Sequence, residues 1–177
     1  MKDKLREAID NFANGIWDVF NLESNDIDLE SFVKNIGGTI ETCDELPNGA
    51  DGMLRKTSND VTDHNFEISV NKELSSQRIK FTIAHELGHL FLHCGYIVNK
   101  EKWDAVDLTY YKNEQSDENE LEANEFARDF LMPEDRLREF IMDHSHDNRI
   151  DMNLVANNFN VSLGAAINRA RQLGIIE

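Results

Sequence analysis

The stretch RIKFTIAHELGHLFLHCG occupies residues 78–95 and decides how the rest of the chain is interpreted. Three histidines recur in it at intervals of four residues: His85, His89 and His93. At about 100° per residue, they fall within one polar arc of a helix, which also contains Thr82 and Glu86. The opposite side is apolar, with Ile79, Ile83, Leu87 and Leu90. The pattern predicts an amphipathic helix, begun by Ser75 or Ser76 as N-cap, with its apolar side on a core and its histidines facing a cleft.

Residues 85–89 form the pattern HExxH. Residues four apart lie one turn above each other on a helix, so His85 and His89 can share a tetrahedral Zn²⁺ at about 2.0–2.1 Å from each nitrogen. Glu86 projects near the same face and can reach a water at the metal rather than the metal itself. Five-residue patterns also arise by chance, so a helix with incidental surface histidines is the alternative.

The third histidine, His93, extends the spacing by one more turn. On a straight helix, it lies about 12 Å along the axis from His85, too far to share one ion. Proteins that add a third histidine to HExxH break the helix after a glycine, and no glycine follows His89 before Gly95. We therefore exclude His93 as a metal ligand. A capping or packing role at the helix end is favoured, and contact with a metal-binding histidine is the alternative.

A catalytic zinc usually has three protein ligands, so one more ligand is needed. The segment 118–131 is helical in pattern, and one of its faces carries Glu120, Ala123, Asn124, Ala127 and Leu131. Its alanines would let it approach the HExxH helix closely. Glu120 is the candidate third ligand, and Asn124 could accept a hydrogen bond from the ring of His85. Glu122 and Glu125 are expected on other faces of this helix.

The remaining pattern indicates a mixed set of helices and strands. Residues 95–119 are polar and aperiodic, and are expected to form a long, mobile excursion with short helical pieces. Tyr110 and Tyr111 within it, and His93, are candidates for an oxyanion donor. Other helices are expected at 3–20, 28–35, 134–144, 151–158 and 162–173, and strands at 39–41, 53–56 and 66–71.

Composition limits the classes of function. The chain has 177 residues, of which 40% are hydrophobic and 29% charged, as in soluble globular proteins. Its net charge of −16 disfavours nucleic acid and anionic lipid as main partners. The first residues lack the apolar run of a signal peptide, and no run is long enough to span a membrane. The two cysteines form no CxxC pair, so we expect a reducing, cytoplasmic location.

Two segments together resemble a known family. FTIAHELGHLFLH (81–93) followed by ELEANEFARDFLMP (120–133) is similar to the ImmA/IrrE metallo-endopeptidases. The resemblance covers about residues 27–133. It implies an α+β fold, with a small, mostly antiparallel sheet packed against the HExxH helix and helices elsewhere. It also implies Zn²⁺ held by His85, His89 and Glu120, with Glu86 as the catalytic acid and base.

Members of this family are often encoded beside a helix-turn-helix repressor in mobile elements, and some act as antirepressors by cleaving it. We therefore expect a zinc-dependent endopeptidase that acts on a repressor or other regulatory protein in transcription regulation. The predicted division is a metallopeptidase-like domain at 1–133 and a C-terminal helical region at 134–177. An extended substrate could add to an exposed strand of the sheet at 53–56 or 66–70.

The C-terminal region suggests a competing function. LVANNFNVS (154–162) and AAINRARQLG (165–174) resemble two helices of a helix-turn-helix. Residues 149–177 contain three arginines against two acids, a balance of only +1, which disfavours DNA binding. The alternatives to the peptidase are thus a DNA-binding or protein-docking regulator whose metal site is structural. His144 and His146 form no further metal set and are expected in solvent.

Overall fold

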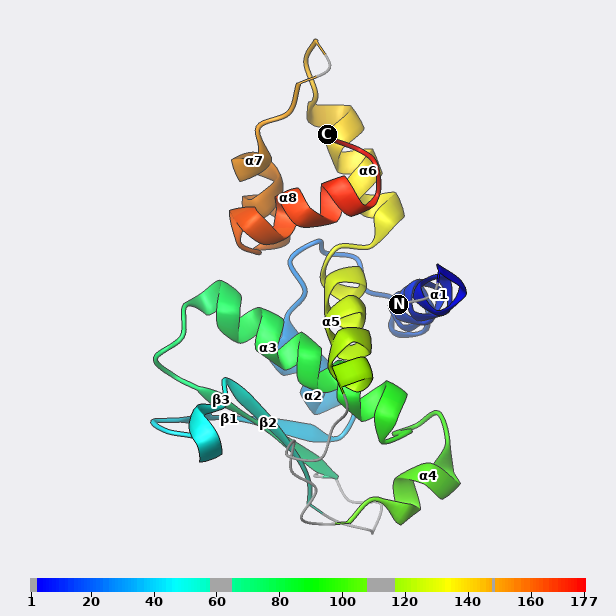
Figure 1. The fold of residues 1–177 in the computed structure, drawn as a ribbon, viewed down its shortest axis with the longest axis vertical. Coiled ribbons are helices and arrows are strands. Elements are labelled where there is room, and N and C mark those ends of the chain that lie inside the picture. Colours follow the sequence, from blue (N-terminus) through cyan, green and yellow to red (C-terminus); the bar gives the residue numbers. More distant parts are fainter. Residues whose placement is uncertain (1–2, 58–64, 108–116, 148) are drawn as a thin grey trace. The chain divides into compact units, whose positions relative to one another are not determined.

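The computed structural model describes residues 3–57, 65–107, 117–147 and 149–177. They form two compact units (Figure 1). The first, here called the site unit, comprises Asp28–Asn124. The second, the helical unit, comprises Lys2–Ile27 and Glu125–Glu177. Helix α5, Asp117–Leu131, contributes its first half to the site unit and its second half to the helical unit.

The site unit is built on a three-stranded sheet in the order β1-β3-β2. Its strands are β1 (Gly38–Cys43), β2 (Gly52–Lys56) and β3 (Phe66–Asn71). The central strand β3 buries Phe66, Ile68 and Val70 completely, as its alternating pattern predicts. This confirms the α+β class, although the sheet is mixed rather than mostly antiparallel. Strand β3 lies between the two earlier strands, and it runs parallel to β1 and antiparallel to β2.

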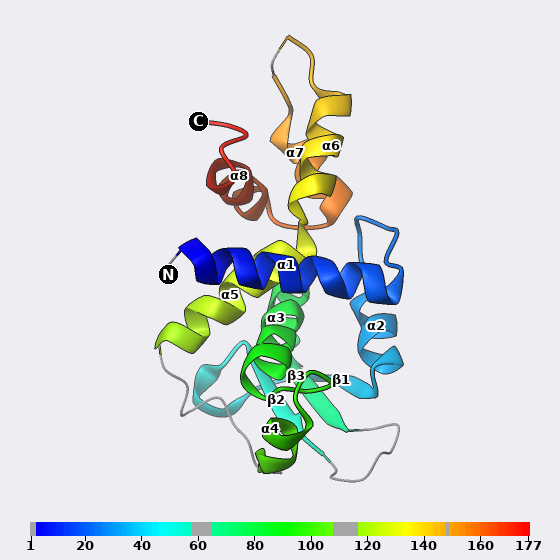
Figure 2. The same ribbon diagram turned by 90° about the vertical axis from the view of Figure 1, so that its right-hand side faces the viewer.

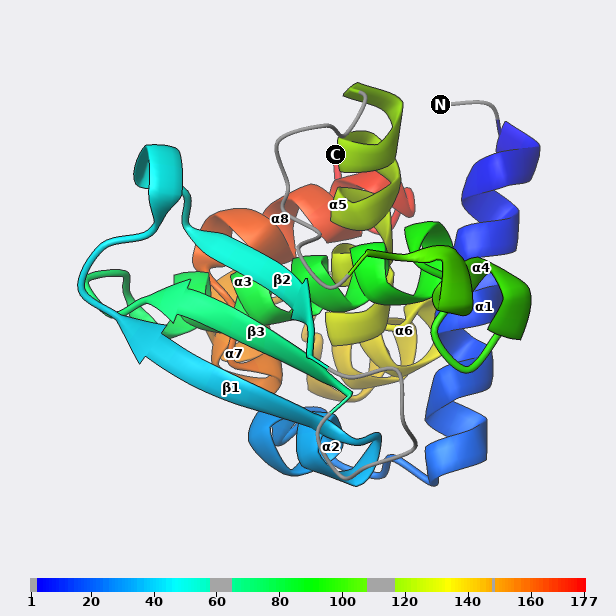
Figure 3. The same cartoon turned by 90° about the horizontal axis from the view of Figure 1, so that it is seen from below.

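Two helices pack on this sheet. Helix α3 (Ser76–Gly88) begins at Ser75, whose side chain accepts a hydrogen bond from the Arg78 amide. It lies along one face of the sheet (Figure 3), with Ile83 and Leu87 buried. It continues as a π-helical turn, η2 (His89–His93). Helix α2 (Leu29–Asn35) is capped by Asp28 and packs against β1. A 3₁₀ turn, η1 (Pro47–Gly49), connects β1 to β2.

The excursion after α3 contains one short helix, α4 (Lys100–Ala105), capped by Asn99. The buried side chain of Lys56 on β2 donates hydrogen bonds to the carbonyls of Trp103 and Val106, and its Nζ lies 4.8 Å from the centre of the Trp103 ring. The start of the excursion is thus fastened to the sheet. Residues 108–116, which include Tyr110 and Tyr111, lie outside the described residues.

The helical unit contains α1 (Asp3–Phe20), the second half of α5, α6 (Glu134–His144), α7 (Met152–Phe159) and α8 (Leu163–Gln172). Helix α1 crosses α5 (Figure 2), where the Trp17 indole donates to the Phe130 carbonyl at 2.9 Å. The compact units therefore group the first helix with the last ones and divide the chain within α5. The two domains predicted at 1–133 and 134–177 follow other boundaries and stay a prediction.

The predicted pair of C-terminal helices, α7 and α8, is joined by a turn in which Asn160 has a left-handed backbone and Ser162 caps α8. Arg169 of α8 is only 2% exposed. Its guanidinium lies 2.7 Å from Asp129 and 3.2 Å from Asp10, and its Nε donates to the Met132 carbonyl. This arginine therefore holds the helical unit together and does not face solvent.

Among the described helices, none combines the length and apolar character that a membrane span requires.

Candidate metal centre

His85, His89 and Glu120 converge on one point of the site unit. The two Nε2 atoms of the histidines lie 2.9 Å apart. The Glu120 carboxylate lies 3.4 Å from each of them, through one oxygen per histidine. All three residues offer a ligand atom within 4.8 Å of the others. The structure thus brings together the three residues that the sequence predicts as ligands.

The chemistry of this donor set fits a divalent cation. A tetrahedral zinc with bonds of about 2.0–2.1 Å places two nitrogen ligands about 3.3 Å apart, close to the spacing of these two histidines. Nδ1 of His85 lies 3.1 Å from Oδ1 of Asn124, which accepts a hydrogen bond from the ring N–H. The lone pair of His85 Nε2 then faces Glu120. Two histidines and a glutamate are also the ligands of a common class of zinc peptidase site.

Glu86 follows His85 on α3 and is 1% exposed. The position of the Glu86 carboxylate depends on Gly52 of β2. A Cβ added to Gly52 would lie 2.4 Å from the Thr82 methyl and 3.0 Å from Oε1 of Glu86. Only a strand without a side chain here can approach α3 so closely. Gly52 is the first residue of β2, and no local sequence pattern shows which helix it faces.

A cavity of about 330 Å³ opens onto the group. Its lining includes His85, Arg78 and Phe81 of α3, Glu120 and Asn124 of α5, and Asp51. Arg78 donates from Nε to Asp51 at 2.8 Å, which joins the start of α3 to the residue before β2. The predicted cleft therefore exists on the polar side of α3.

His93 lies outside the group of three but contacts it. Its Nδ1 is 2.9 Å from Nδ1 of His89, and its Nε2 is 3.2 Å from the Glu122 carboxylate. Burial lowers the pKa of His93, and Glu122 opposes part of this shift. The π turn η2, closed by the hydrogen bond from the Cys94 amide to the His89 carbonyl, sets this geometry. The sequence predicts Glu122 on another face of its helix. It favours capping or packing for His93, with contact to a metal-binding histidine as the alternative, and the structure has this contact.

Comparison with known families agrees with this geometry. The family model of the M78 peptidases, described as the IrrE N-terminal-like domain, matches residues 49–171. The chain belongs to this family. No curated protein sequence gives a significant match.

Among solved structures, this M78 family member is similar to a transcriptional regulator of Mycobacterium tuberculosis, with a TM-score of 0.59 and 21% sequence identity. The match covers 92% of this chain and 46% of that protein, so the chain spans about half of its length. At this identity, the likeness supports the fold alone.

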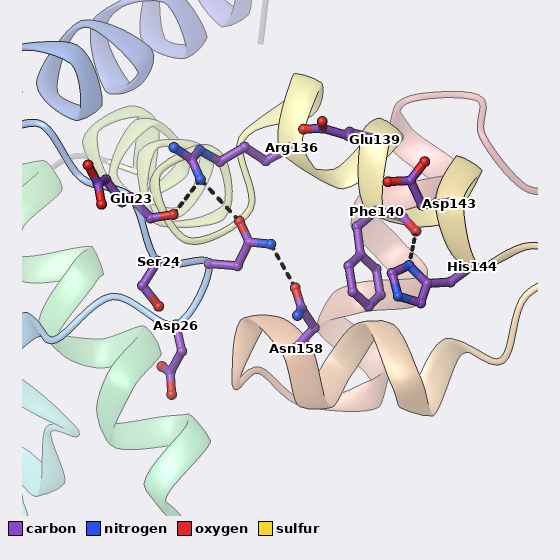
Figure 4. Close-up of a pocket in the computed structure, with 10 residues that line it drawn as sticks. Glu23, Ser24, Asp26, Arg136, Glu139, Phe140, Asp143, His144 and Asn158 are labelled. Atoms are coloured by element: carbon purple, nitrogen blue, oxygen red, sulfur yellow. Dashed lines mark hydrogen bonds between the residues drawn. The ribbon is translucent and has the colours of Figure 1, made fainter.

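A second cavity, of about 310 Å³, lies in the helical unit of the family member (Figure 4). Its polar walls are joined to each other: Arg136 donates to the Glu23 carbonyl at 2.7 Å, and Asn25 donates to Asn158 at 2.8 Å. His144 donates to the Phe140 carbonyl and stacks on that ring at 4.1 Å. His144 and His146 are exposed, as expected. These contacts fasten the loop after α1 to α6 and α7.

Proposed function

We propose that this chain is a zinc-dependent endopeptidase. The observation that carries the proposal is the group of His85, His89 and Glu120 in a member of the M78 peptidase family. Two of these residues, His85 and Glu120, line a cavity, and Glu86 follows His85 on the same helix. His85, His89 and Glu120 would hold the ion. When bound, zinc lowers the pKa of a water and polarises the carbonyl of the scissile bond.

Glu86 acts as the base and then as the acid. It removes a proton from the attacking water, and it delivers that proton to the amine of the departing peptide. Its carboxylate is held between α3 and Gly52, which fixes its position relative to the histidine before it in sequence. Asn124 orients His85 by accepting a hydrogen bond from its Nδ1–H.

Strand β2 offers a surface for an extended substrate. Hydrogen bonds join Asp51 to Asn71 and Thr57 to Asn65, so the odd-numbered positions of β2 pair with β3. Gly52 and Leu54 therefore direct their backbone N–H and C=O groups away from β3. A peptide that pairs with this edge would pass beside Glu86, because Gly52 lies against it.

We propose a regulatory protein of transcription, such as a helix-turn-helix repressor, as the substrate, and the cytoplasm as the location. The family resemblance supports this choice. Direct DNA binding is less favoured, because the net charge is −16 and Arg169 of α8 is held inside the helical unit. A regulator that keeps its metal only for structure remains the second candidate.

The experiment compares the native chain with Glu86→Gln. Both are loaded with zinc and incubated with a library of unstructured peptides and with a repressor encoded nearby, and products are followed by mass spectrometry. We expect equal zinc content in both proteins and cleavage by the native chain alone. Cleavage by Glu86→Gln at the native rate would overturn the mechanism. Zinc binding without cleavage by the native chain would favour the second candidate.

A further inference from the structure

Resting on the proposed function, we infer that Glu122 and His93 form a hydrogen-bonded relay that holds His89 in the tautomer able to bind the metal, so that Glu122 is a positioning residue. The relay follows from three side chains in series. Glu122 contacts Nε2 of His93 at 3.2 Å, and Nδ1 of His93 contacts Nδ1 of His89 at 2.9 Å. The remaining nitrogen of His89, Nε2, faces His85 and Glu120.

Glu122, at the end of the series, sets the direction of both hydrogen bonds. A carboxylate only accepts, so Nε2 of His93 carries a proton and donates to Glu122. A neutral imidazole with that proton has its lone pair on Nδ1. His93 must then accept from His89, whose proton therefore resides on Nδ1. The Nε2 of His89 is left with its lone pair directed at Glu120 and His85.

The opposite direction would disable the site. If His93 donated from Nδ1, the proton of His89 would move to Nε2, where it would occupy the position that a metal ion needs. Glu122 prevents this arrangement because it requires the proton of a neutral His93 at Nε2. Histidines that bind metals usually donate their other N–H to an acceptor that fixes the tautomer, and here a second imidazole is inserted between histidine and carboxylate.

The two ligand histidines are thus oriented in different ways from one helix. Asn124 of α5 accepts directly from His85, whereas Glu122 of the same helix acts on His89 through His93. His89 is fully buried, and the side chains of His93 and Glu122 are 9% and 24% exposed. Little water reaches the inner contact, so replacement of the relay by solvent is unfavourable.

The test measures zinc affinity of the full chain by competition with a chromophoric chelator. Glu122→Gln keeps the shape of the side chain, but an amide can donate as well as accept, so it no longer fixes the proton of His93 at Nε2. We expect the zinc affinity to fall by about 10-fold. His93→Phe removes both contacts and should lower affinity by about 10–100-fold. His93→Gln should recover most of it, since its carbonyl can accept from His89 and its amide can donate to Glu122. Glu118→Gln, an exposed acid of the same helix, is the matched control.

A second readout follows the tautomer itself. In the metal-free native chain, the ¹⁵N shifts of His89 should report a proton on Nδ1, and Glu122→Gln should show both tautomers. Zinc affinities of Glu122→Gln and His93→Phe within about twofold of native would overturn the relay. His85→Ala separates the two proposals: if it binds zinc as tightly as the native chain, the metal site itself is wrong. Loss of zinc in His85→Ala with native affinity in the relay variants would reject the relay alone.

Discussion

At the scale of single residues, the proposed role of Glu86 depends on the close approach of a strand backbone to helix α3. Gly52 illustrates this, because its missing side chain leaves the space that Thr82 and Glu86 fill. HExxH identified both histidines and the glutamate, since their spacing is a property of one helix. Gly52, by contrast, belongs to strand β2, and only the tertiary fold brings that strand against α3.

Gly52→Ala is therefore expected to impair the site without removing a ligand. The new Cβ would lie 2.4 Å from the Thr82 methyl, so β2 or the Glu86 carboxylate must shift. We expect a stability loss of about 1–3 kcal/mol and a lower kcat/KM, with zinc content retained. Urea unfolding, zinc analysis and peptide cleavage measure the three quantities. Gly15→Ala, where the Cβ meets nothing within 4 Å, is the control. Unchanged cleavage by Gly52→Ala would show that Glu86 does not depend on this close approach.

The sequence predicts that His85, His89 and Glu120 lie together, but it does not predict the contact between Glu122 and His93. Glu120 and Asn124 share a helical face with the alanines, so periodicity was enough to propose them together. Glu122 lies about 200° around the helix from Glu120, and an ideal wheel places it away from the site. Its contact with His93 depends on the π turn after Gly88, and no proline or other local signal in the sequence announces that turn.

At the scale of elements, the bounds of most helices followed from apolar spacing and caps, as with Glu134–His144 and Ser75 before α3. The pairing of the strands could not be predicted in this way, because β1 and β2 are separated in the sheet by a later strand, β3. The ion pairs among α1, α5 and α8 were also missed. Arg169 and Asp129 are 40 residues apart in sequence, and their attraction has no periodic signature.

These buried charges give a pH dependence to the helical unit. Burial raises the pKa of Asp129 from 3.8 to about 7, with Glu125 and Asp10 adding to the increase and Arg169 and Arg128 opposing it. An acid whose pKa is raised on folding binds more protons in the folded state between those two values. The free energy of unfolding should therefore fall as pH rises from about 4 to 7, and level off above it.

Asp129→Asn tests this linkage, because asparagine keeps an oxygen for Arg169 and cannot titrate. We expect native stability to fall more steeply than that of the variant between pH 5 and 7. The measurement is the urea midpoint at four pH values, followed by Trp17 fluorescence in a Trp103→Phe background. Asp135→Asn, an exposed acid of α6, should behave as the native chain. Parallel pH curves for the native chain and Asp129→Asn would contradict the assignment.

At the scale of the whole molecule, the sequence predicts the α+β class, whereas the grouping of α1 with Glu125–Glu177 in one compact unit has no local signal. Local patterns cannot reveal that α1 packs with residues more than one hundred positions later, as Trp17 does with Phe130. The proposed metal ligands, by contrast, all lie in the site unit. A metal that joins α3 to the first half of α5 should stabilise that unit first.

Hydrogen exchange with and without zinc tests this consequence. At a free zinc concentration of about 100 times Kd, the ligand-bound unit gains about 2.7 kcal/mol. Amides of α3 and of Asp117–Asn124 should then exchange about 100-fold more slowly where they exchange through unfolding of the site unit. Amides of α7 and α8 should be unaffected, because their core and the Arg169 network lie in the helical unit. His85→Ala should abolish the zinc effect throughout. Equal slowing in α7 and α8 would mean that the two units unfold together, and that metal binding at α3 governs the stability of the C-terminal helices as well.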